Sequence, residues 1–220
     1  MSERRALQVL HVDNHLLVVH KPAGLPTVPD SSGDESLLER AKVWVGREFA
    51  KPGNVFLGVV QRLDRPVSGV LCFARTSKAA DRLTRQLKQK RMAKRYLART
   101  LGWTAADRGE VEQWLLKDRV RNRVRVVPAE TPESKLAITR WEVRDRRGGL
   151  IELEPVTGRP HQLRVACSTL GAPIVGDLKY GAPEPLGDQS IALHAWRLVL
   201  DHPTRDERLA FEQPPPWGRG

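Results

Sequence analysis

A short polar segment carries the residues whose spacing most strongly suggests chemistry. Within Gln61–Gly69, the carboxylate of Asp64 stands between two guanidinium groups, those of Arg62 and Arg65. Nearby positive charge favours the ionised form of a carboxyl group. An ionised carboxylate on a rigid loop can act as a nucleophile or as a base. Taken alone, these residues also allow a second interpretation, a turn with surface ion pairs.

A second polar stretch, residues 157–164, has the pattern of a strand that passes into a helix. Thr157 suits the helix cap, Pro160 suits the first turn, and Gly171 suits the stop. His161 and Arg164 are three residues apart, so they would share one face of that helix. The amino-terminal end of a helix also favours anions. The pattern therefore predicts an anion-friendly surface with an imidazole and a guanidinium group.

Three extended segments supply further candidates for binding. Tyr96 lies in an alternating run, where its ring could stack on a base or simply fill the core. Lys21 follows a buried strand and either faces a ligand at the sheet end or is a solvated turn lysine. Arginines at every second position of 119–125 would line one face of a ribbon that binds a nucleic-acid backbone, or protect an exposed edge. These arginines are Arg119, Arg121, Arg123 and Arg125.

The charge of the whole chain favours a polyanionic partner. Its 220 residues, 40% of them apolar, fit one domain with a core, and they carry a formal net charge of +11. A basic surface attracts phosphate polyanions, most commonly nucleic acid, although some basic domains are merely soluble or bind membrane surfaces. The basic helix expected at 77–90 contains a single acid, Asp81, which favours a surface that faces phosphates.

Cysteine usage and hydropathy bear on the compartment. Cys72 and Cys167 each lie in an apolar stretch, which favours buried free thiols in a reducing cytosol over a disulfide. The apolar runs are shorter than a membrane span, and the first residues do not precede a signal-peptide core. We therefore expect a cytoplasmic protein.

Hydrophobic periodicity predicts a mixture of strands and helices. Helices are expected at 34–49 with Asp34 as the cap, at 77–90, and from about 157 to 170. Strands are expected at 7–12, 16–20, 55–60, 70–74, 93–100, within a hairpin at 110–127, and at 135–144, 150–154 and 191–201. The prolines after residue 213 predict an extended tail.

Several of these stretches match patterns that recur together in one family. The run from Gln61 to Gly69 matches H-R-L-D-x-x-T-S-G except for Gln61 and Val67. Residues 157–164 match T-G-R-x-H-Q-L-R, although Ala166 stands where many members have histidine. Further matches are D-x-x-L-L-V-V-x-K-P-x-G-L from residue 13, K-x-Y-x-A from residue 94, and G-x-P-I-x-G-D-x-x-Y-G from residue 171. Through these motifs the chain resembles the RluA-type pseudouridine synthases from about residue 7 to residue 213.

The resemblance implies a single catalytic domain over residues 1–220, without a separate N-terminal RNA-binding domain and with 214–220 as a tail. The implied fold is α/β mixed (α+β), a pseudouridine synthase fold with a largely antiparallel mixed sheet, flanking helices and a central cleft. The implied reaction isomerises uridine to pseudouridine in a stem-loop of ribosomal or transfer RNA, with no metal or cofactor. A monomer is expected.

The resemblance also implies roles for individual residues. Asp64 would be the catalytic carboxylate that attacks the sugar, attacks the base or removes a proton. Arg164 would pair with it and keep it ionised, and Tyr96 would stack on the extruded uracil and serve in proton transfer. Arg62 would occupy the vacated space in the RNA stack, and Leu163 would form the pocket wall. Further substrate contacts are expected from Lys21, His161, Arg121 and Arg123.

Two functions of other classes remain open from the sequence. A non-catalytic RNA-binding or chaperone protein on the same fold is compatible with the three departures from the family patterns. A metal-dependent nuclease would use Asp64, Asp177 and His161, but such enzymes need clustered carboxylates, which this sequence lacks.

Overall fold

The computed structural model describes residues 6–103 and 106–217, and these divide into two compact units. The first unit comprises Met1–Ala93 and Arg197–Gln213, and the second comprises Lys94–Trp196 and Pro214–Gly220. The described residues form eleven strands, three α-helices and one short 3-10 helix. The expectation of a single catalytic domain stays a prediction.

The strands of the first unit follow the order β1-β2-β4-β10, with β11 beside β10 and β3 beside β4. In register, Lys21 of β2 faces Gly69 of β4, and Leu16 faces Ala74. The end of β2 therefore lies beside the start of β4, where the Asp64 loop enters the sheet. Sequence periodicity had not indicated β11. The strands are β1 (Gln8–Val12), β2 (Leu16–Lys21), β3 (Gly58–Val59), β4 (Ser68–Ala74), β10 (Leu193–Asp201) and β11 (Arg208–Glu212), and β10 belongs to this unit from Arg197 onward.

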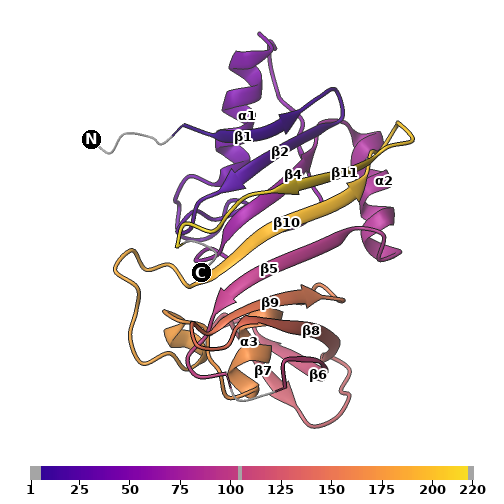
Figure 1. The fold of residues 1–220 in the computed structure, drawn as a ribbon. Helices are drawn as coiled ribbons and strands as arrows, with labels where there is room; N and C mark the ends of the chain where they lie inside the picture. Colours follow the sequence, from indigo (N-terminus) through magenta and orange to yellow (C-terminus); the bar gives the residue numbers. More distant parts are fainter. Residues whose placement is uncertain (1–5, 104–105, 218–220) are drawn as a thin grey trace. The chain divides into compact units, whose positions relative to one another are not determined.

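Two helices belong to the first unit, α1 (Leu37–Glu48) and α2 (Ser77–Lys88), and both lie behind its strands in the view of Figure 1. The cap of α1 is Ser36, in a capping box with Glu39, and not Asp34 as the sequence suggested. The position just before the apolar run decides the cap, because the side-chain oxygen must reach the third backbone N–H of the helix.

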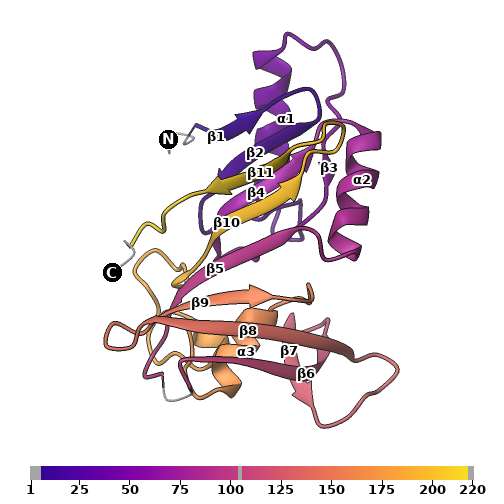
Figure 2. The same ribbon diagram turned by 45° about the vertical axis from the view of Figure 1, so that its right-hand side comes forward.

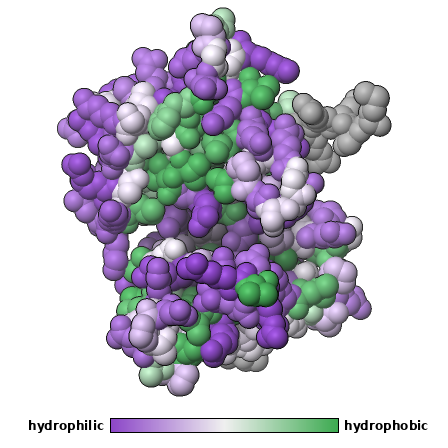
Figure 3. Space-filling model, turned by 180° about the vertical axis from the view of Figure 1, so that it is seen from behind, coloured by the Kyte–Doolittle hydropathy of each residue, from purple (hydrophilic) through white to green (hydrophobic). Residues whose placement is uncertain are grey.

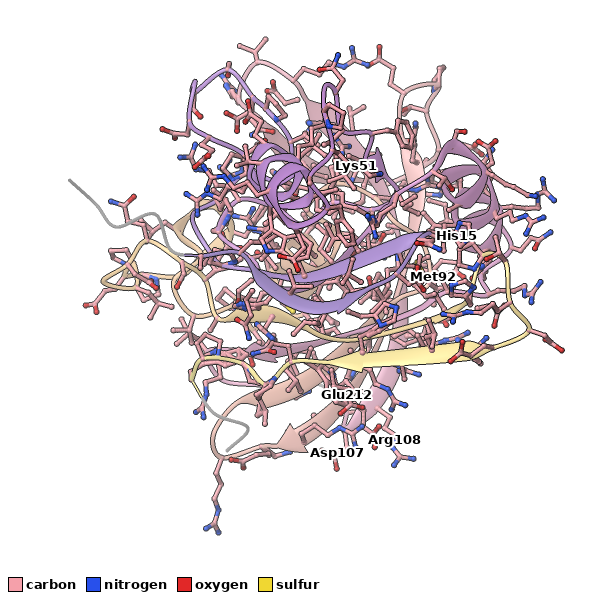
Figure 4. The ribbon with its side chains drawn as sticks, turned by 90° about the horizontal axis from the view of Figure 1, so that it is seen from above. His15, Lys51, Met92, Asp107, Arg108 and Glu212 are labelled. Carbon is pink, nitrogen blue, oxygen red and sulfur yellow. The ribbon has the colours of Figure 1, made fainter. Side chains whose placement is uncertain are left out.

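The core of the first unit forms where α2 packs on the sheet. Apolar side chains of α2 pack against those of β2, β4 and β10 in one buried cluster, which also includes Met92, labelled in Figure 4. Its buried members are Leu16, Val18, Val70, Cys72, Ala74, Ala79, Leu83, Met92, Leu198 and Leu200. The periodicity predicted for this helix and these strands is thus explained by burial on one shared face.

Some large apolar side chains of the first unit remain exposed on α1 and on the segment after it. Among them are Val43, Phe49 and Phe56. Figure 3 shows apolar residues gathered in its upper half, which corresponds to this unit. The Arg75 guanidinium lies 4.0 Å from the centroid of the Phe49 ring and covers part of this apolar surface.

In the second unit the strands β5-β9-β8-β6-β7 are joined by antiparallel pairing. The predicted hairpin is present as β6 and β7. Figure 2 shows α3 (Gln162–Thr169) behind these strands, where it packs with the short helix η1 (Leu178–Tyr180). The strands are β5 (Ala93–Arg99), β6 (Arg108–Asp118), β7 (Arg123–Val127), β8 (Lys135–Asp145) and β9 (Leu150–Pro155).

Ion pairs bridge neighbouring strands of this second sheet. Arg140 Nε lies 2.6 Å from Glu110 Oε2, and Arg108 Nη2 lies 2.8 Å from Glu142 Oε1. Arg108, labelled in Figure 4, begins β6 and marks one end of this ladder. Opposite charges on adjacent strands stabilise the pairing modestly and leave little net charge there.

Each unit contains one buried thiol, as the sequence predicted. Cys72 lies in β4 and Cys167 in α3, and both are free cysteines. Burial raises the pKa of the Cys72 thiol to about 12 and also raises the pKa of Cys167. Within residues 6–103 and 106–217, every helix is too short or too polar to cross a membrane.

Candidate active site

The loop that carries Asp64 is held from both sides by the segment that follows β2. The Thr27 hydroxyl donates to the carbonyl of Leu63 at 2.8 Å and accepts from the N–H of the same residue at 3.2 Å. On the other side, the Gly24 N–H donates to the Arg65 carbonyl at 2.9 Å. Both neighbours of Asp64 are therefore fixed, and its half-buried carboxylate projects from a rigid backbone.

Lys21 also holds this loop and is fully buried, with 0% of its surface exposed. Its Nζ donates to the carbonyls of Leu25 at 2.6 Å, Pro22 at 3.0 Å and Arg65 at 3.2 Å. Burial lowers the pKa of Lys21 to about 7, while the charge of Asp64 acts in the opposite direction. An amino group enclosed by three carbonyls supports a positioning role for Lys21, and the expected contact with substrate stays a prediction.

The arginines on either side of Asp64 differ in their surroundings. Arg65 Nε donates to the Gly24 carbonyl at 3.0 Å, and its Nη2 pairs with Asp34. Arg65 thus fastens the loop, and Asp34, expected as a helix cap, takes part in that fastening. Arg62 is exposed, as a residue that enters an RNA stack would have to be. Gly69 has φ +131°, a conformation that favours glycine at the exit of the loop.

In the second unit, Gln162 organises the turn before α3. Its side-chain oxygen accepts from the Thr157 hydroxyl at 2.8 Å and from the Arg159 N–H at 3.0 Å. Its amide nitrogen donates to the Ile138 carbonyl at 2.8 Å. The expected cap by Thr157 is therefore wrong, because α3 begins only at Gln162. His161 precedes it with φ +54°, in the left-handed region.

Arg164 forms a buried bidentate pair with Asp177. Its Nε and Nη2 each lie 2.7 Å from a carboxylate oxygen, and 6% and 1% of the two side chains are exposed. Sequence reasoning missed this partner, although Asp177 belongs to the G-D-x-x-Y-G run that it had singled out. The expected pairing of Arg164 with Asp64 stays a prediction, because the two residues belong to different units.

Tyr180 connects α3, η1 and the hairpin. Its hydroxyl lies 2.6 Å from His161 Nδ1 and accepts from the Val124 N–H at 2.9 Å. The Arg164 and Arg123 guanidinium carbons lie 5.0 and 5.8 Å from the centroid of its ring. His161 and Arg164, expected on one helix face, are thus brought together through an aromatic ring that sequence reasoning had not assigned a role.

The hairpin arginines border a cavity of about 420 Å³ between β6, β7 and α3. Val165 and Tyr180 form part of its wall, and Arg121, Arg123 and Arg125 are exposed around it. The hairpin therefore presents guanidinium groups beside a concave surface. This is compatible with the expected backbone contacts from Arg121 and Arg123.

Tyr96 and Leu163 are both largely enclosed within the second unit. Tyr96 of β5 is 9% exposed and faces Leu153 of β9, and Leu163 belongs to α3. Their expected roles at the uracil ring stay predictions.

The residues of the nuclease alternative are engaged in other contacts. Asp177 pairs with Arg164, and His161 lies against Tyr180. Among the residues that the structure describes, no group of three or more His, Cys, Asp or Glu side chains could hold a metal ion. The geometry therefore favours the other interpretations of Asp64.

Comparison with known proteins identifies the family. Residues 15–169 match the RNA pseudouridylate synthase family. The dual-specificity RNA pseudouridine synthase RluA of Haemophilus influenzae is 37% identical over 215 residues, which cover 93% of this chain and 91% of that protein. The ribosomal large subunit pseudouridine synthase D of Nitrosomonas europaea is 33% identical over 98% of this chain and 64% of its own length.

Solved structures agree with this match. Human RNA pseudouridylate synthase domain containing 4 aligns with a TM-score of 0.78 and 25% identity, over 95% of this chain and 88% of that one. Human RNA pseudouridylate synthase domain containing 1 aligns with a TM-score of 0.72 and 27% identity, over 96% of this chain and 84% of that one. The chain belongs to the RNA pseudouridylate synthase family, in its RluA-type branch. It is an isomerase that acts on RNA, and the predicted mixed, largely antiparallel fold is confirmed.

Proposed function

We propose that the protein isomerises particular uridines in stem-loops of ribosomal and transfer RNA, with Asp64 as the catalytic carboxylate. The observation that carries the assignment of Asp64 is the fixed backbone on both sides of it, made by Thr27, Gly24 and Lys21. The similarity to a dual-specificity enzyme supports the RNA classes. The formal net charge of +11 supports a polyanionic partner.

The reaction is an isomerisation and needs positioned groups of moderate reactivity. The N-glycosidic bond of the extruded uridine breaks, the uracil turns, and a C-glycosidic bond forms at C5, whose hydrogen leaves as a proton while the freed N1 gains one. Asp64 attacks the sugar, attacks the base or removes a proton. Tyr96 stacks on the ring, and Arg164 orients the carboxylate. Arg62, which is exposed, fills the space left in the RNA stack.

The surrounding residues support the same site without acting on the reacting atoms. Lys21 and Thr27 hold the loop that carries Asp64. His161 lies close to Tyr180, and Leu163 contributes an apolar wall. The hairpin arginines attract the RNA backbone. We infer a monomer in the cytoplasm, where the buried free thiols of Cys72 and Cys167 would remain reduced.

The test is a release assay on RNA that carries tritium at uridine C5. Isomerisation releases the label without cutting the chain, because the C5 hydrogen exchanges with solvent. The wild-type protein should release tritium, whereas Asp64→Asn should not, since the amide lacks the charge and nucleophilicity of the carboxylate. Its affinity for RNA should remain.

Asp81→Asn, at an exposed position of α2 in the same unit, is the matched control and should retain turnover. Turnover by Asp64→Asn close to that of the wild type would remove Asp64 from the mechanism. RNA binding without release by the wild type would instead support the non-catalytic alternative, and chain cleavage would support the nuclease.

A further inference from the structure

The first unit contains a polar pocket at the carboxyl-terminal end of α2. The turn between β10 and β11 forms its other wall, and Figures 1 and 2 both show this turn beside the helix. Its volume is about 480 Å³. Five arginines contribute to its lining, namely Arg82, Arg85, Arg91, Arg205 and Arg208.

The acids of the pocket neutralise some of these arginines and leave others. Asp201 accepts from Arg91 at 2.6 Å and from Arg208 at 2.7 Å. Arg205 lies 3.4 Å from Glu207 and 2.9 Å from Asp13, which stands outside the lining. These three acids therefore offset three guanidinium groups.

Among the residues that the structure describes, two arginines of α2 have no carboxylate partner. Arg82 donates to the neutral Pro203 carbonyl at 2.5 Å. In the described part of the chain, the guanidinium group of Arg85 makes neither a hydrogen bond nor an ion pair, and the residue is exposed. Asp206 is the remaining acid of the lining. The balance over the lining is positive, and Lys78 and Lys88 extend it along the same helix.

The walls of the pocket are held before any ligand arrives. The Gln86 amide donates to the Asp201 carbonyl at 2.7 Å and accepts from the N–H of that residue at 2.9 Å, as a neighbouring strand would. His202 Nδ1 accepts from the Arg205 N–H at 2.9 Å, and its Nε2 contacts Asp13 at 2.9 Å. Binding there would therefore require little ordering of the walls.

The pocket lies far from the Asp64 loop. That loop enters the sheet where Lys21 faces Gly69, whereas Asp13, which binds His202, stands beyond the Leu16–Ala74 pair at the other end of the same strands. At a strand rise of about 3.3 Å per residue, the five residue steps between the two ends of this ladder span about 17 Å. A ligand of the pocket would not touch the reacting nucleotide.

We propose that this pocket binds a backbone phosphate of the substrate RNA on the stem, away from the target uridine. The inference rests on the proposed function. Guanidinium groups match phosphate oxygens in geometry and charge, and α2 presents them at the mouth of a concave site. A free phosphate has the same chemistry, so the experiment must separate the two sources.

The experiment compares Arg85→Ala with Arg47→Ala. Both arginines lie exposed in the last turn of a helix of the first unit, and alanine is a good helix former at either position. Two synthetic hairpin RNAs share one uridine-containing loop, and the stem of the second is longer by a helical turn. The dissociation constant is measured by fluorescence anisotropy at several salt concentrations.

For the long-stem RNA, Arg85→Ala should lower the slope of log affinity against log salt by about 0.7–0.9, because one phosphate is no longer neutralised. The short-stem RNA should bind the variant as it binds the wild type. Arg47→Ala should leave both slopes unchanged. Equal slopes for wild type and Arg85→Ala on the long stem would overturn the proposal.

The second arm titrates inorganic phosphate at constant ionic strength and follows its binding by calorimetry. Saturable binding to the wild type, abolished in Arg85→Ala while the RNA slopes stay equal, would assign the pocket to a free phosphate and also overturn the proposal. These measurements do not depend on turnover. Absence of tritium release by the wild type would therefore contradict the proposed function, and the binding measurements could still be interpreted.

Discussion

At the scale of single residues, the Arg164–Asp177 pair combines burial with a specific geometry. Removing two charges from water is costly, and a bidentate guanidinium–carboxylate contact offsets much of that cost. Once formed, such a pair penalises the loss of either member, because the remaining charge stays buried without compensation. Arg164 thus has a structural partner within its own unit, in addition to its proposed role toward Asp64.

Arg164→Met should abolish turnover and lower the free energy of unfolding by about 3–5 kcal/mol, since it leaves Asp177 buried and unpaired. Adding Asp177→Asn should recover part of this stability and none of the turnover. Urea unfolding and tritium release measure the two effects. Arg108→Met, which breaks a pair whose arginine side chain is 79% exposed, should cost at most about 1 kcal/mol. Equal losses for Arg108→Met and Arg164→Met would contradict the argument.

Lys21 should make stability depend on pH. Its pKa is lowered from 10.5 to about 7 in the folded protein, so between these values the unfolded chain binds a proton that the folded chain does not. Stability should therefore rise with pH across this window, by up to about 1.4 kcal/mol per unit. Below pH 7 the ammonium is present in both states and the contribution is constant.

The measurement is urea unfolding of the wild type and of Lys21→Met from pH 7 to 10. The free energy of unfolding of the wild type, measured relative to that of Lys21→Met, should increase as pH rises. Lys42→Met, at an exposed position of α1, should show a constant difference. Parallel curves for the wild type and Lys21→Met would show that Lys21 remains charged in the fold.

At the scale of elements, the segment after β2 acts on Asp64 through the backbone. Thr27→Val keeps the shape of the side chain but leaves the Leu63 N–H and carbonyl without their partner, at a cost of about 1–3 kcal/mol. We expect the single-turnover rate to fall while RNA affinity is unchanged. Thr27→Ser should restore the rate, because it restores the hydroxyl. If Ser and Val lose equal activity, packing of the methyl group explains the position instead.

The β6–β7 hairpin should contribute to RNA affinity through charge. Replacing Arg121 and Arg123 with alanine should reduce the salt slope of RNA binding by about 0.7–0.9 for each phosphate that the hairpin no longer neutralises. Arg147→Ala, at an exposed turn of the same unit, is the control and should leave the slope unchanged. An unchanged slope in the double variant would reassign the hairpin arginines to plain solvent exposure.

At the scale of the whole molecule, local patterns predicted most of the elements and long-range contacts decided the rest. The continuous apolar runs Leu16 to Val19 and Val70 to Ala74 predicted strands, and all of their side chains are buried. The same reasoning overlooked β11, whose alternating residues are half-exposed against β10. An edge strand of this kind has a weak hydrophobic signal.

The site was predictable as residue types and not as a set of partners. The motifs pointed to Asp64, Tyr96 and Arg164, whereas the bonds that fix them come from elsewhere in the chain. Thr27 is 36 residues from Leu63, and Asp177 is 13 residues from Arg164. Sequence periodicity contains no information on such pairings. The Thr157 cap failed for a related reason, since the Thr157 hydroxyl accepts from the Ile138 N–H and donates to the Gln162 side chain.

The two cysteines make the opening of each unit separately measurable. Cys72 in the first unit and Cys167 in the second are both buried, and their raised pKa values keep them as unreactive thiols. An alkylating reagent should therefore modify each one only when its own surroundings unfold. Peptide mass spectrometry would then give two rates from one native sample. Equal rates would mean that both halves of the enzyme open as one cooperative body, and unequal rates would identify the half that opens first.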